Sequence, residues 1–244
     1  MRGSDLPQWL PYCGEGPTPD GWLARWNFAP ELIVLLVLCG IGIYLCRDKL
    51  RTRPAVAALA CFGFLYTSPF CALGSALFTV RIVHDVILAT VLAPLVVTSL
   101  KLDRIAIPGS TAVWTAIHAL TFWIWHAPPL YEAAMSSDAA FWAMQASIVS
   151  TAALWWVKVV RAPAPSAATA LLATMVAMGM LGALLAFAGR AFYAPHWFTT
   201  QSWGLSPLDD QQIAGILMWA PASLVYLLAA LVLLYRSLDR RLPA

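Results

Sequence analysis

The sequence predicts an all-α integral membrane protein with seven transmembrane helices, an external N-terminus and a cytoplasmic C-terminus. Of the 244 residues, 61% are hydrophobic and 11% charged, and the mean hydropathy is +0.73. A soluble domain carries about 25% charged residues, so lipid must replace most of the water around this chain. The net charge of +3 gives no indication of a nucleic-acid partner.

Long apolar runs define the expected helices. A backbone inside hydrocarbon must satisfy its own hydrogen bonds, and runs of about 20 apolar residues select helices over barrel strands. The seven runs are 30–46, 54–76, 82–100, 108–127, 139–159, 167–188 and 212–235. The second run is interrupted by "SPFCALG" at 68–74. We expect an external segment over 1–27, a membrane domain over 28–236 and a cytoplasmic tail over 237–244.

The basic residues set the orientation. With seven crossings, the loops after the first, third and fifth helices lie on the same side as the C-terminal tail. These segments hold eleven of the fifteen Lys and Arg residues, and the other side holds Arg2, Arg25, Arg81 and Arg190. Lys and Arg concentrate on the cytoplasmic side of membrane proteins. The N-terminus is therefore expected outside, as in a multi-pass protein of a bacterial inner membrane.

The polar residues of the spans gather near the outer ends. His84 and Asp85 fall in the first outer turn of the third helix, His126 lies at the outer end of the fourth, and Asp210 starts the seventh. Ionisable residues inside a membrane are costly and mark functional sites. Each also has a structural interpretation, in which a histidine lies at the interface or hydrogen-bonds across helices.

Imidazole and carboxylate suit copper, zinc or iron, and methionine sulfur favours Cu(I). We therefore expect a possible copper site at His84, His126, Asp210 and Met218. The supporting residues are expected to be Asp85, His118, Gln211, Gln212 and His196. No nucleophile elbow, phosphate loop or HExxH motif occurs, so no enzyme is predicted.

The stretch "SPLDDQQIAG" at 206–215 contains two adjacent carboxylates, Asp209 and Asp210, for which we expect different roles. Ser206 fits an N-cap, Pro207 the first helical position and Asp209 the third. Adjacent helical residues point about 100° apart, so Asp209 and Asp210 cannot share a face. We expect Asp209 to cap its helix in water and Asp210 to face the bundle near His84 and His126. Gln211 or Gln212 would orient a site residue.

Several segments resemble the CtaG-like assembly factors of caa3-type cytochrome c oxidase, over roughly 65–235. They are "GLSPLDDQQIAGILMW" (204–219), "WHAPPLYEAAM" (125–135), "FWAMQASIVSTAALWWVKV" (141–159) and "HDVILATVLAPLVV" (84–97). Many members carry two further histidines, where this chain has Val80 and Gln145. A metal site that needed those histidines would be incomplete here. Three alternatives follow: the site is reduced, it uses His126 and Asp210 as ligands instead, or metal binding has been lost.

The resemblance implies a membrane-embedded assembly factor for a haem–copper oxidase, which assists copper delivery at the outer face. Its partners would be oxidase subunits or other assembly factors, within the lipid bilayer. The alternative is a redox subunit that holds b-type haem between His84 and either His118 or His126, since bis-imidazole haem needs two facing histidines. A transporter is disfavoured because the cytoplasmic halves of the helices are nearly free of polar residues.

The five cysteines form no CxxC motif. Cys13 and Cys71 both fall outside, where disulfides are permitted. We expect them to be unbridged, because the N-terminal segment looks flexible by its composition.

Overall fold

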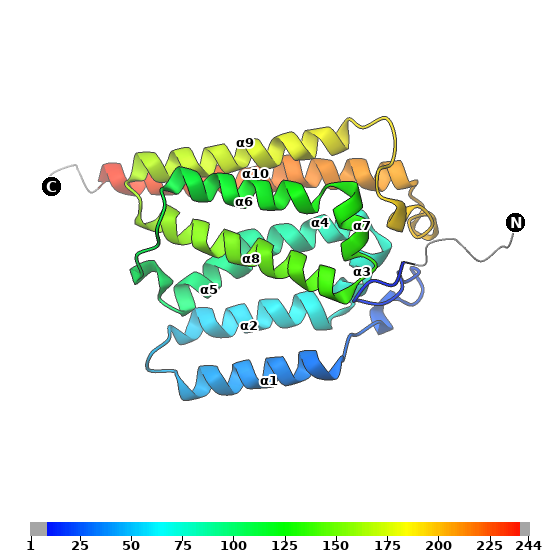
Figure 1. Cartoon of the computed structure of the whole chain (residues 1–244), viewed down its shortest axis with the longest axis horizontal. Coiled ribbons are helices and arrows are strands. Elements are labelled where there is room, and N and C mark those ends of the chain that lie inside the picture. Colours follow the sequence, from blue (N-terminus) through cyan, green and yellow to red (C-terminus); the bar gives the residue numbers. More distant parts are fainter. Residues whose placement is uncertain (1–8, 240–244) are drawn as a thin grey trace, which may run out of the picture.

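The computed structural model describes residues 9–239, and within that range it contains helices and connecting segments but no strand. The helices lie side by side along the long axis of the molecule (Figure 1). Residues 1–8 and 240–244, which include Arg2, Arg240 and Arg241 of the charge count, lie outside the described residues. The α-helices are α1 (Pro30–Leu45), α2 (Thr52–Thr67), α3 (Pro69–Ala76), α4 (Phe78–Ile87), α5 (Ala93–Ser99), α6 (Thr111–Trp125), α7 (Pro128–Ala134), α8 (Asp138–Arg161), α9 (Ala164–Ala186) and α10 (Pro207–Asp239).

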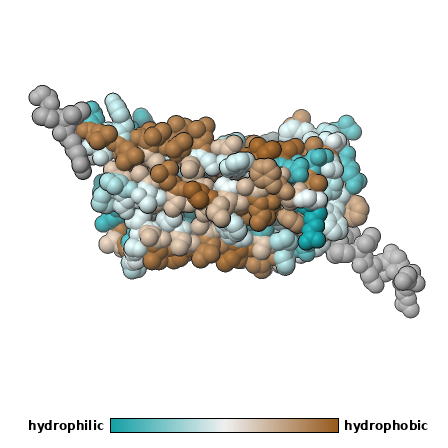
Figure 2. Space-filling model, turned by 90° about the horizontal axis from the view of Figure 1, so that it is seen from above, coloured by the Kyte–Doolittle hydropathy of each residue, from teal (hydrophilic) through white to brown (hydrophobic). Residues whose placement is uncertain are grey.

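Four helical stretches are long and apolar enough to cross a membrane: Phe78–Ser99, Asp138–Arg161, Ala164–Ala186 and Pro207–Asp239. A fifth results if α2 and α3, which meet at 49°, form one broken span. The helix Pro30–Leu45 is apolar but shorter. The surface in Figure 2 agrees, with apolar side chains over the middle of the long axis and polar ones near its ends. An all-helical membrane protein is supported, and crossing by all seven segments stays a prediction.

The interruption at "SPFCALG" has a local cause. Ser68 ends α2, and its hydroxyl accepts a hydrogen bond from the Phe70 amide at 3.2 Å, which caps α3. Pro69 occupies the first position of α3, where its missing N–H costs nothing. A further irregularity joins α4 to α5, because residues Leu88–Leu92 form a π-helical turn just before Pro94. Proline cannot donate to the helical ladder, and such turns absorb the disturbance.

The helices α9 and α10 make the closest contact in the bundle. A Cβ atom on Gly215 would lie 2.5 Å from the Gly182 carbonyl oxygen, and one on Gly182 would lie 2.7 Å from the Gly215 carbonyl oxygen. Small residues allow membrane helices to approach at the backbone, where van der Waals packing replaces the hydrophobic effect. This pair fixes the height of α10, and hence of its amino-terminal residues, against the other helices.

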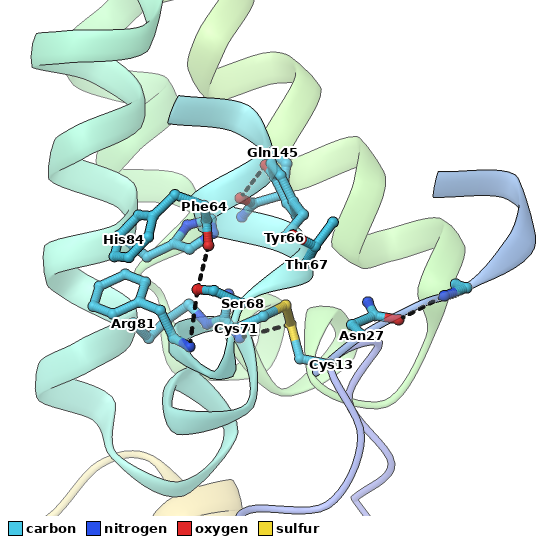
Figure 3. Close-up of a disulfide and its surroundings, with 12 residues drawn as sticks. Cys13, Asn27, Phe64, Tyr66, Thr67, Ser68, Cys71, Arg81, His84 and Gln145 are labelled. Carbon is cyan, nitrogen blue, oxygen red and sulfur yellow. Dashed lines mark hydrogen bonds between the residues drawn. A yellow bond between two sulfur atoms is a disulfide. The ribbon is translucent and has the colours of Figure 1, made fainter. Parts of the chain in front are cut away.

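The segment before α1 packs on one end of the bundle, and its disulfide corrects our expectation. Cys13 and Cys71 are bridged, with their Cα atoms 5.4 Å apart (Figure 3). The prediction that they are unbridged was wrong, because the segment has fixed contacts. Tyr12 stacks on Phe141 with ring centroids 5.2 Å apart, and the Pro17 carbonyl accepts a hydrogen bond from the Trp203 indole at 2.9 Å. We call residues 9–27 the N-terminal strap.

Candidate functional site

Three charged or titratable side chains of α4 are buried at the end of the bundle that carries the disulfide. Arg81 and Asp85 are completely buried, and His84 is 1% exposed. Spacings of three and four residues place such side chains on neighbouring positions of one helix surface. The His84 Nδ1 atom lies 3.4 Å from Asp85 Oδ1. The helix α4 therefore brings Arg81, His84 and Asp85 together in one buried cluster.

A chain of hydrogen bonds connects Asp85 to α8 and α2. The Gln145 amide nitrogen donates to Asp85 Oδ1 at 3.3 Å, and the Tyr66 hydroxyl donates to the Gln145 amide oxygen at 2.8 Å. The Tyr66 ring also stands edge-on to His84, with centroids 5.1 Å apart. Figure 3 shows Tyr66, Gln145 and His84 close to the Cys13–Cys71 disulfide. Gln145, at the place of a family histidine, thus orients a buried carboxylate.

His126 ends α6 and is 3% exposed. Its Nδ1 lies 2.7 Å from the Phe122 carbonyl oxygen, and its own carbonyl accepts a hydrogen bond from the Tyr193 hydroxyl at 2.8 Å. These contacts hold the ring with Nδ1 protonated, which leaves Nε2 with a free lone pair. Of the two histidines, His84 is the one in direct contact with Asp85, and His126 is held by Phe122 and Tyr193.

The cluster around Asp85 contains several polar atoms that no protein group within residues 9–239 satisfies. Buried polar atoms nearly always have a hydrogen-bond partner, and an unmet one costs about 1–3 kcal/mol. The unpartnered atoms of the cluster are Arg81 Nε and Nη1, His84 Nδ1 and Nε2, Asp85 Oδ2 and His126 Nε2. Their concentration in one place is typical of a site that receives a polar guest.

Arg81 is the residue of this cluster that our sequence analysis missed. It was counted as an external loop residue, yet its guanidinium lies over the Phe141 ring at 5.2 Å and 3.8 Å from Cys13 Sγ. Among the described residues, no carboxylate lies within ion-pair distance of it. The spacing in "RIVHD" was the available signal, because positions 81, 84 and 85 fall on one helical surface.

Asp210 is buried, as predicted, but its carboxylate is bound to backbone. Its Oδ2 accepts from the Phe78 amide at 2.6 Å, and its Oδ1 accepts from the Thr79 amide at 3.1 Å. Asp209 instead faces water and accepts from the Ser206 amide and hydroxyl at 3.1 and 2.6 Å. The expected division between the two carboxylates is confirmed. Neither carboxylate oxygen of Asp210 bonds to a histidine, and the hydrogen bonds place it at the amino-terminus of α4.

The two glutamines bind the connection between α9 and α10. Gln211 accepts from the Phe192 amide at 2.7 Å and donates to the Arg190 carbonyl at 3.2 Å. Gln212 donates to the Ala188 carbonyl at 3.2 Å. The expectation that one of them orients a metal ligand was wrong, because their amides satisfy backbone groups of the loop instead.

The remaining predicted residues occupy separate positions. His118 is completely buried on α6, stacks on Trp155 at 5.5 Å and has Nδ1 3.5 Å from the Thr151 hydroxyl. Met218 is completely buried on α10. His196 is 2% exposed in the loop before α10, and its Nε2 lies 2.7 Å from the Tyr131 hydroxyl. Burial lowers the pKa of His196 to about 3, so its imidazole is neutral.

The described residues contain no group of three His, Cys, Asp or Glu side chains that could bind a metal ion together. Two imidazoles alone remain a chemically sufficient set for Cu(I), which accepts low coordination and nitrogen ligands. Unpartnered ring nitrogens occur on all four histidines of the described chain, His84, His118, His126 and His196.

The comparisons with known proteins identify one family. The cytochrome c oxidase caa3 assembly factors, Caa3_CtaG, match residues 46–240 of this chain. Nothing among the curated proteins or the solved structures matches it. The match covers well over half of the chain and includes every site residue described above. The chain therefore belongs to the Caa3_CtaG family of cytochrome c oxidase caa3 assembly factors.

Proposed function

We propose that this protein works at the outer face of a bacterial inner membrane, where it receives Cu(I) and passes it to a haem–copper oxidase. His84 and His126 would hold the ion, and Asp85 would balance its charge. The observation that carries this proposal is the unpartnered ring nitrogens of two buried histidines, of which His84 lies beside the buried Asp85. The protein would act as a carrier within an assembly complex and not as a catalyst.

The orientation supports an outer site. We propose that all seven helical segments cross the membrane, with the N-terminus outside. Eleven of the fifteen basic residues then lie on the cytoplasmic side. The Cys13–Cys71 disulfide supports the same orientation, because disulfides persist in oxidising compartments. A reporter fused after Ala244 should be cytoplasmic, and an external signal would contradict the proposal.

The proposal is tested by histidine variants in a strain that depends on this protein for oxidase maturation. His84→Ala and His126→Ala should each lower the copper content and activity of the oxidase, with the variant present at the normal level. The matched control is His118→Gln, which removes an equally buried imidazole that lies away from Asp85. Loss of maturation in the control, or in neither test variant, would contradict the assignment.

A binding assay separates copper transfer from other assembly roles. Purified protein should compete with a chromophoric Cu(I) chelator, and each test variant should compete less well. Met218→Leu keeps the volume of the side chain and tests the thioether that the sequence suggested as a further ligand. Asp209→Asn should leave Cu(I) binding unchanged, because its carboxylate caps α10 in water. A Soret band in the purified protein would instead support the haem alternative.

A further inference from the structure

A cavity lies between α1, α2, α5 and α8, and Tyr66 and Gln145 of the hydrogen-bond chain are among its lining residues. It has a volume of about 520 Å³. Ligand pockets typically enclose about 300–1,000 Å³, so the volume suits a small molecule. Its lining on α2 extends from Ala55 to Tyr66, which corresponds to about 16 Å at 1.5 Å per residue. The cavity is therefore elongated along the helices.

The walls of the cavity are almost entirely apolar. Leu36 and Ile43 of α1, Leu59 of α2, Val96 of α5 and Val149 of α8 are among the lining residues. None of the lining residues is charged, and none is a histidine. A long apolar chain would be matched by these walls. An anionic lipid head group would find no cation there, and haem would find no axial imidazole.

The outer end of the cavity has a different character. Phe62, Tyr66 and Trp142 meet there, with the Tyr66 and Trp142 rings stacked at 5.0 Å and the Phe62 and Tyr66 rings 4.6 Å apart. Aromatic side chains favour flat, polarisable groups through stacking. The strap residue Tyr12 packs against Trp142 at 5.1 Å beside this end. A flat group therefore suits this end of the cavity.

Two residues with polar side chains, Tyr66 and Gln145, line the cavity at the same end. The Tyr66 hydroxyl donates to the Gln145 amide oxygen at 2.8 Å, and Gln145 donates one amide hydrogen to Asp85 at 3.3 Å. A primary amide has two hydrogens, and a phenol oxygen can also accept a bond. The second Gln145 hydrogen and the Tyr66 lone pair therefore leave one donor and one acceptor for a guest.

We propose that this cavity binds an isoprenoid quinone. The isoprenoid tail lies along α1 and α2, and the flat ring lies at the aromatic end. A quinone carbonyl accepts the second hydrogen of Gln145, and a quinol hydroxyl donates to the Tyr66 oxygen. The site adjoins the cluster around Asp85 through Tyr66 and Gln145, and the inference goes beyond copper transfer. Figure 3 shows Tyr66 and Gln145 next to each other.

The first experiment measures what the purified protein retains. Protein purified from bacterial membranes in mild detergent is extracted with organic solvent, and quinone is quantified by chromatography and its oxidised-minus-reduced absorption. Ala146→Phe places a ring in the cavity, and we expect it to abolish the bound quinone. Ala173→Phe is the matched control, because Ala173 lines a groove of about 490 Å³ between α6 and α9. Equal quinone in both variants, or phospholipid alone in the wild type, would overturn the proposal.

The second experiment locates the head group. A short-chain ubiquinone analogue with a photoreactive azide should label a peptide that contains residues 142–150. Tyr66→Phe and Gln145→Leu should weaken its binding between about twofold and tenfold, the range of a single hydrogen bond. His126→Ala should leave labelling unchanged, because the His126 ring packs on Phe122, which does not line the cavity, and this separates the site from the proposed copper site. Labelling confined to α6 or α9, or unaffected by both substitutions, would overturn the assignment.

Discussion

Asp210 caps a neighbouring helix through Phe78, whose backbone nitrogen lies 2.6 Å from Asp210 Oδ2. The residue before α4 is Leu77, which has no side-chain oxygen to satisfy the first free amides of the helix. Asp210 supplies that acceptor from α10, and its backbone carbonyl accepts a further bond from the Thr79 hydroxyl at 2.8 Å. The carboxylate therefore fixes the start of the helix that carries Arg81, His84 and Asp85.

We predict that Asp210→Ala acts mainly through stability. Two amides of α4 would lose their acceptor in a buried place, at a cost of about 1–3 kcal/mol. Thermal unfolding in detergent should shift to lower temperature, and the protein level should fall. Asp209→Ala, which changes an exposed cap, should shift the transition much less. An Asp210→Ala protein with normal stability but no oxidase maturation would instead indicate a direct functional role.

The contact between α9 and α10 gives a second prediction. Gly215→Ala would place a Cβ atom 2.5 Å from the Gly182 carbonyl oxygen, so the two helices must separate. Overpacking of this kind costs about 1–3 kcal/mol, and it would also shift the residues of α10 that cap α4. The loss should appear as a lower unfolding temperature. Gly42→Ala on α1 is the control, because its Cβ atom would meet nothing within 4 Å, and an equal loss there would contradict the explanation.

The disulfide supports a third prediction. Cys13 and Cys71 are separated by 58 residues, and closing a loop of that length corresponds to about 4 kcal/mol in the chain-entropy account. Cys13→Ser and Cys71→Ser should each lower the unfolding temperature, and the double variant should be no less stable than either. Non-reducing peptide mapping should recover the two cysteines in one linked species. Free thiols at both positions in the purified protein would contradict the structure.

Local sequence patterns predicted the helices, and they also predicted that Asp209 is an exposed cap and Asp210 is buried. Both predictions depend only on the spacing of residues along a single segment. The 100° turn per residue was enough to separate an exposed cap from a buried carboxylate. The partner of Asp210 depends on how α10 meets α4, and no periodicity within either segment specifies that contact. The disulfide was missed for a similar reason, because the packing of Tyr12 against Phe141 is long-range. Arg81 was missed because charge counting assigned it to a loop, although its helical spacing to His84 and Asp85 was visible.

His196 gives the last prediction, a pH dependence of stability. The residue is packed between Tyr131 and Phe78, and burial lowers its pKa from the ordinary 6.5 to about 3. The unfolded chain therefore binds the proton more readily than the folded protein does between those two values. Stability is fully present above about pH 6.5 and falls by up to about 1.4 kcal/mol for each unit below it.

The measurement compares wild type with His196→Phe by thermal unfolding between pH 7 and pH 5, where most carboxylates keep their charge. The substitution keeps an aromatic ring beside Phe78 but removes the titrating group, and its loss of the Tyr131 hydrogen bond is independent of pH. We expect the variant to be less stable at pH 7 and to lose less stability on acidification than the wild type. Parallel losses in the two proteins would show that other groups carry the pH dependence and that the His196 ring accepts a proton without unfolding.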